Sequence, residues 1–133
     1  MNHHRHDVLP YLDALREHLV RHDVPSPVSV ECTNWREPIA VHLYEITLSD
    51  LASALLLWTK SLDGVTVTAK RMRHDQSVHL TVVGRVASGV PLHVWGGVRF
   101  ERPLFPDLPT GVEQDVELST LHRWKHPGQG VAA

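Results

Sequence analysis

Histidine is the residue type in this sequence that offers the most chemistry. There are eleven in 133 residues, and His18 and His22 are four positions apart. On a helix, residues four apart share a face, and two imidazoles placed in this way can bind one metal ion. Zinc would still need a third and a fourth ligand. We therefore interpret His18 and His22 as residues at the edge of an apolar stripe and near a helix end, and expect no metal site.

A second group of candidate residues is predicted on one face of a sheet. Apolar residues alternate with polar ones over residues 65–70, 78–83 and 90–95, and short turns separate these segments. Antiparallel pairing then places Lys70 opposite His79, Thr81 opposite Trp95, and Val83 opposite His93. His79 and His93 would be about 13 Å apart, too far to share a metal ion. The predicted interaction face comprises Trp95, His93, His79, Thr81, Lys70 and Arg85, and His42 joins it only if the earlier strand belongs to the same sheet.

Trp95 is predicted on the face of the sheet that is turned away from the helices, where it needs cover or a partner. Three interpretations remain open. The terminal segment around Leu104, Phe105, Leu121 or Trp124 folds back over it; or a second copy or a protein partner docks on it; or a nucleic-acid base stacks on it. The third is disfavoured because aromatic residues are few and no RNP motif is present.

The most basic stretch is residues 121–126, which contains Arg123, Trp124 and Lys125. Cationic side chains around a tryptophan can contact phosphate and a base. Acidic residues between positions 113 and 117 weaken that field. A solvated tail with Trp124 anchored on the domain is therefore the preferred interpretation, and nucleic-acid contact the alternative.

Recognised catalytic and cofactor-binding motifs are absent from the sequence, including phosphate loops, nucleophile elbows and paired-cysteine metal motifs. The single cysteine, Cys32, alternates with Val28 and Val30, so we expect it in the core as an unreactive thiol. Gly96-Gly97 precedes no helix and is interpreted as a bulge or bend at a strand end. No cofactor is predicted.

The periodicities predict a single α+β domain over residues 1–133 in the order α-β-β-α-β-β-β, with an antiparallel sheet backed on one face by helices. The segments are a helix over 8–22, strands over 28–32 and 39–44, a buried helix over 50–62 capped by Ser49, and the three strands above. A proline-rich loop over 99–111 and a short helix over 113–126 follow, and residues 1–6 and 128–133 are expected to fray.

Composition places the chain among ordinary globular domains, with 42% hydrophobic residues, 21% charged residues and a formal net charge of -2. The unpaired cysteine and the lack of a long apolar stretch predict a cytoplasmic protein without membrane association. We expect a non-catalytic interaction module that docks a protein partner or a second copy through the outer sheet face, with Trp95 as its anchor. A nucleic-acid-binding accessory protein is the alternative, and a small metal- or histidine-dependent enzyme the third hypothesis.

Overall fold

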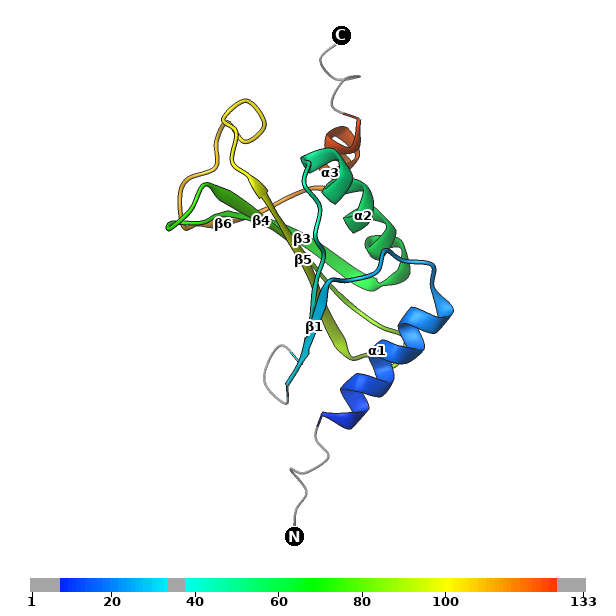
Figure 1. The fold of residues 1–133 in the computed structure, drawn as a ribbon. Coiled ribbons are helices and arrows are strands. Elements are labelled where there is room, and N and C mark those ends of the chain that lie inside the picture. The colour runs from blue at the N-terminus through cyan, green and yellow to red at the C-terminus, as the bar shows by residue number, and fades with distance from the viewer. Residues whose placement is uncertain (1–7, 34–37, 127–133) are drawn as a thin grey trace.

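The computed structural model describes residues 8–33 and 38–126, which form one mixed sheet with helices on one of its faces (Figure 1). The predicted α+β class is confirmed; the structure adds the short strand β6 and contains the predicted C-terminal helix as α3. None of the helices in this part of the chain is long and apolar enough to cross a membrane. The elements are α1 (Leu9–Arg21), β1 (Ser29–Cys32), β2 (Ile39–His42), α2 (Leu48–Ser61), β3 (Asp63–Arg71), β4 (Ser77–Arg85), β5 (Pro91–Arg99), β6 (Glu113–Asp115) and α3 (Leu118–Lys125).

The strand order across the sheet is β1-β2-β5-β4-β3-β6. All neighbouring strands are antiparallel except β2 and β5, which are parallel. After β2 the chain passes through α2 to β3, and the β3-β4-β5 meander then returns β5 to the side of β2. The three predicted cross-strand pairs are confirmed, since Lys70 lies opposite His79, Thr81 opposite Trp95 and Val83 opposite His93.

Helix α2 lies over the middle of the sheet and carries seven buried residues, as its nearly uniform apolar sequence predicts. Its N-cap is Thr47 rather than the predicted Ser49, because the Thr47 hydroxyl oxygen accepts a hydrogen bond of 3.1 Å from the Asp50 N–H. The Ser49 hydroxyl instead donates to the Lys125 carbonyl at 2.8 Å. Ser49 therefore ties the start of α2 to the end of α3.

Gly96 and Gly97 lie inside β5, which continues to Arg99, so the predicted bend at a strand end is wrong. Gly96 faces the helices, where a Cβ atom would lie 2.5 Å from Leu51 Cδ1 and 3.1 Å from the Leu43 carbonyl oxygen. The glycine is needed because α2 and the chain after β2 approach the strand this closely.

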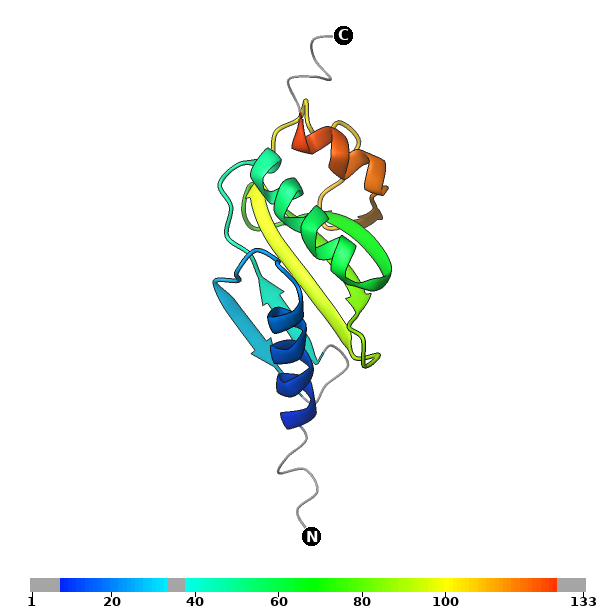
Figure 2. The same cartoon turned by 90° about the vertical axis from the view of Figure 1, so that its right-hand side faces the viewer.

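The segment after β5 packs on the helix side of the sheet (Figure 2). Phe105 and Leu121 are buried there, and the half-buried Trp124 ring meets Phe105 edge-on at 5.3 Å. The predicted helix over 113–126 is shorter than expected because residues 113–115 pair with β3 as β6. This terminal segment therefore does not cover the outer face on which Trp95 lies.

The first helix and the first strand bury less than predicted. Helix α1 buries only Ala14, Leu15 and His18, while Leu12 is 44% and Leu19 36% exposed. Cys32 is half-buried and packs at the margin of the core, so its predicted place inside the core is wrong. Burial raises the pKa of its thiol, which keeps the sulfur protonated at neutral pH. The physical reason is that β1 lies at the edge of the sheet, beyond the reach of α2.

Candidate functional site

Three rings form a stack on the outer face of the sheet, which no described helix covers (Figure 1). The Trp95 ring on β5 lies parallel to the His42 ring of β2, with centroids 4.0 Å apart and an interplanar angle of 5°. The His79 ring of β4 lies 4.8 Å from the Trp95 ring at 32°. Because β5 runs between β2 and β4, the two imidazoles approach the indole from opposite sides. We call His42, Trp95 and His79 the aromatic stack; all three are half-buried.

The sheet register explains why these rings meet. His42 is paired with Trp95 across the parallel β2–β5 contact, so the condition under which His42 joins this face is met. His79 is paired with Gly97, which has no side chain. A Cβ atom at Gly97 would lie 3.3 Å from His79 Cδ2. The glycine therefore leaves the space into which the His79 imidazole leans toward Trp95.

A shallow groove of about 480 Å³ runs from the aromatic stack toward the connection between β2 and α2. Tyr44 and Ile46 line it from that connection and are 66% and 77% exposed. Arg99 and Glu45 contribute charges of both signs to its rim. A half-buried aromatic centre beside two exposed apolar side chains and a polar rim has the composition of a protein-binding patch.

The His79 imidazole is favoured in its neutral form. Burial is the main cause of its lowered pKa, the charges of His42 and Lys70 lower it further, and the Asp75 carboxylate opposes them. Asp75 itself has a lowered pKa, chiefly because the Ser77 hydroxyl donates a hydrogen bond to it. At neutral pH the His79 ring therefore adds no charge to the aromatic stack.

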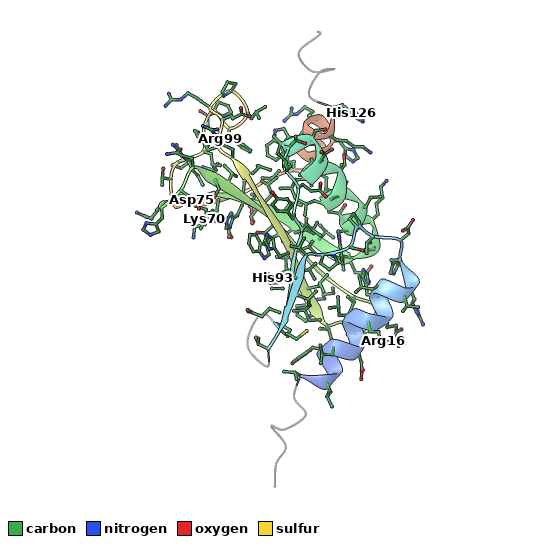
Figure 3. The ribbon with its side chains drawn as sticks, in the orientation of Figure 1. Arg16, Lys70, Asp75, His93, Arg99 and His126 are labelled. Carbon is green, nitrogen blue, oxygen red and sulfur yellow. The ribbon has the colours of Figure 1, made fainter. Side chains whose placement is uncertain are left out.

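The other residues of the predicted face are only partly brought together. Thr81 is paired with Trp95, and His93 lies on the same face of β5 two positions before it. Lys70 and Asp75 gather near the end of the sheet farthest from α1 (Figure 3). Arg85 lies six positions from His79 along β4, about 20 Å away, and donates to the Gly89 carbonyl in the following turn. Arg85 therefore shares the outer face with His79 but lies far from the aromatic stack.

In the predicted basic stretch at the C-terminal end, the tryptophan packs on the domain and acidic residues lie near the arginine. The Trp124 ring packs on Phe105, and the Lys125 carbonyl accepts from Ser49. Arg123 donates to Thr120 and borders a cleft of about 510 Å³. Three carboxylate residues line the same cleft: Asp107, Asp115 and Glu117. The cationic field is therefore diluted, and α3 lies across the sheet from Lys70.

His18 has a structural role that its position at the edge of the stripe did not indicate, since it is only 3% exposed. Its Nε2 atom lies 2.8 Å from the Ser61 hydroxyl, which donates its own hydrogen to the Trp58 carbonyl. Nε2 therefore carries a hydrogen and donates to Ser61. Burial, and secondarily His22, lowers the pKa of His18. The ring centroids of His18 and His22 are 4.4 Å apart. Residues 8–33 and 38–126 contain no group of three or more candidate metal ligands, so no third described ligand lies near these two histidines.

Sequence reasoning missed Tyr44 and Ile46 as parts of the groove. The sequence does contain an indication of their exposure, because two large apolar residues occur in a short connection immediately before the helix cap. Comparison of the chain with protein-family models, with curated proteins and with solved structures gives no match.

Proposed function

We propose that this chain is a non-catalytic binding module that docks a protein partner through the aromatic stack and the adjoining groove. One observation carries the proposal: the terminal segment packs on the helix side and does not cover the half-buried Trp95, which lies beside the exposed Tyr44 and Ile46. Large apolar and aromatic side chains that stay exposed together on a sheet commonly mark an interface.

The stack geometry favours a protein over a nucleic acid as the partner. Base stacking needs an open ring face, and both faces of Trp95 carry an imidazole. The groove rim also holds Glu45 opposite in sign to Arg99. A partner side chain inserted between Tyr44 and Ile46 would meet apolar surface and polar rim together, as at protein interfaces.

Selection from a displayed library of random peptides tests the proposal. Peptides enriched on the wild-type protein should bind the Ile46→Glu variant at least about tenfold more weakly, because a buried charge would then face the apolar contact. Ile46 is largely solvent-exposed, so the variant keeps the fold. The matched control is Leu57→Glu, which introduces the same charge at an exposed position of α2.

The bound site is then mapped by the NMR signals of the Trp95 indole and the His42 and His79 rings. Shifts of these signals on peptide addition support the proposal. Light scattering that shows a wild-type dimer which is lost in Ile46→Glu also supports it, and the partner is then a second copy of the chain. Peptides that bind Ile46→Glu as well as wild type, or that shift only signals on the helix side, contradict it. So does a library from which no peptide is enriched.

A further inference from the structure

Apolar surface is left uncovered at one end of the molecule, away from the aromatic stack. The structure exposes eleven large hydrophobic residues in the part of the chain that it describes, and six of them lie on α1 or in residues 28–30. They are Leu9, Leu12, Leu19, Val20, Val28 and Val30. Concentration of this kind is unusual for a monomer surface and indicates an interface.

One exposed flank of α1, which carries Leu12 and Leu19, is turned toward β1. On its other flank, Ala14, Glu17 and Arg21 line a small pocket with residues 86–88, which form the turn between β4 and β5. At 100° per residue, Leu12 and Leu19 occupy the opposite flank of the helix. The β4–β5 turn and β1 lie on opposite sides of β2 in the strand order, so Leu12 and Leu19 face the β1 edge.

Strand β1 is an edge strand whose outer side pairs with no described strand. The Thr33 N–H donates to the Pro38 carbonyl in register with the β1–β2 pairing. Because hydrogen bonding alternates along an antiparallel strand, the N–H and C=O groups of Val30 and Cys32 point away from β2. The alternation ends before Val28, whose N–H donates to the His42 carbonyl at 2.8 Å. Lysine, proline and bulges commonly protect such edges, and residues 29–32 contain neither lysine nor proline.

We propose that two copies of this chain pair through β1, antiparallel, with the two-fold axis at Val30. The outward groups of Val30 then bond to those of Val30 in the second copy. On the helix side, Val28 meets Cys32 of the second copy, and the exposed flanks of the two α1 helices approach each other. On the other side, Ser29 lies opposite Glu31 of the second copy, which avoids a pair of like charges.

The side-chain pattern selects this register and a second copy as the occupant. A two-fold axis at Glu31 would place two carboxylates face to face, which is destabilising. An isologous contact also covers the apolar flank of α1 with an identical flank, which a lone peptide strand would not do. The contact extends the sheet edge and leaves the aromatic stack open, so it goes beyond the proposed function and stands or falls separately from it.

Sedimentation velocity over a range of concentrations tests the pairing. The wild-type chain should form a dimer, and Val30→Lys should raise the dissociation constant at least about tenfold, since two lysines would meet at the axis. Val112→Lys is the control, because Val112 is 48% exposed and lies just before β6 at the other end of the sheet. Circular dichroism establishes that each variant is folded. A wild-type chain that stays monomeric, or a dimer that survives Val30→Lys, overturns the proposal.

The register is tested by oxidation in a Cys32→Ser background. Ser29→Cys and Glu31→Cys chains, mixed, should form a disulfide between unlike chains, because these positions face each other in a non-hydrogen-bonded pair. Each variant alone should cross-link at most about a tenth as much. Equal cross-linking in the mixture and in the separate chains would contradict the Val30-centred register.

Discussion

His18 is the only buried polar or charged side chain among the described residues. It stacks on Trp58, with ring centroids 5.8 Å apart, and its hydrogen bond to Ser61 joins α1 to the end of α2. The Trp58 indole N–H in turn donates to the Pro25 carbonyl at 3.2 Å, in the connection after α1. This small network holds the sparsely packed α1 on the rest of the molecule.

Replacing His18 with alanine should lower the free energy of unfolding by about 2–3 kcal/mol, because a buried ring and a buried hydrogen bond are lost together. Ser61→Ala should cost about 1 kcal/mol, because only the hydrogen bonds of its hydroxyl are lost. Urea denaturation measures both. His74→Ala, at an exposed turn position, is the control and should change stability by less than about 0.5 kcal/mol. A His18→Ala cost no larger than that of the control would show that the network contributes nothing.

At the scale of elements, the structure depends on how closely α2 approaches β5. The two adjacent glycines of β5 have opposite surroundings, since Gly96 faces Leu51 of α2 and Gly97 faces His79 in the aromatic stack. Alternation along the strand makes this difference a direct consequence of the pleat. A substitution at Gly96 therefore affects the packing of the core, whereas one at Gly97 affects the packing of the outer face.

Gly96→Ala should destabilise the domain by about 1–3 kcal/mol, because the new methyl group overlaps Leu51 Cδ1 and the Leu43 carbonyl. Gly97→Ala should cost less than Gly96→Ala, since its nearest neighbour is a side-chain atom of His79 that can move. Thermal and urea unfolding of the two variants provide the comparison. Equal losses, or a larger loss at Gly97, would contradict the inferred close approach of α2.

On the scale of the whole molecule, the two ends differ in packing. At one end, α2, α3 and the terminal segment cover the sheet, whereas at the other α1 buries three residues and β1 is an open edge. Both histidines whose pKa is lowered by burial, His18 and His79, are neutral in the folded state near pH 7. Lowering the pH should therefore protonate a histidine on each side of the sheet, His18 on the helix side and His79 on the outer face, and each protonation should destabilise the folded chain.

Stability should be full above about pH 6.5, the ordinary histidine pKa, and should fall as the pH drops below it. The unfolded chain binds more protons than the folded one in this range, so protonation favours unfolding. Urea midpoints at about pH 7.5 and about pH 5.5 measure the loss. The His18→Gln and His79→Gln double variant should show a smaller difference between the two pH values, while His74→Gln should behave as wild type. An unchanged difference in the double variant would contradict the assigned cause.

The sequence by itself determined the helices, the three long strands and the cross-strand pairs, because periodicity and short turns act locally along the chain. It also indicated an aromatic outer face around Trp95. Sequence reasoning failed where the answer depended on segments far apart in the chain. Its errors were the burial of His18, the exposure of Leu12 and the place of Cys32, and it left open the course of the chain after β5.

Only the tertiary structure decided these points, and the physical reason is the same for each. The burial of a side chain depends on which element lies over it, and local alternation identifies a face without identifying its cover. The parallel contact between β2 and β5 brings His42 to Trp95, and the packing of Trp124 on Phe105 keeps the terminal segment off the outer face. Alternation placed Trp95 on a face, and long-range packing left that face open.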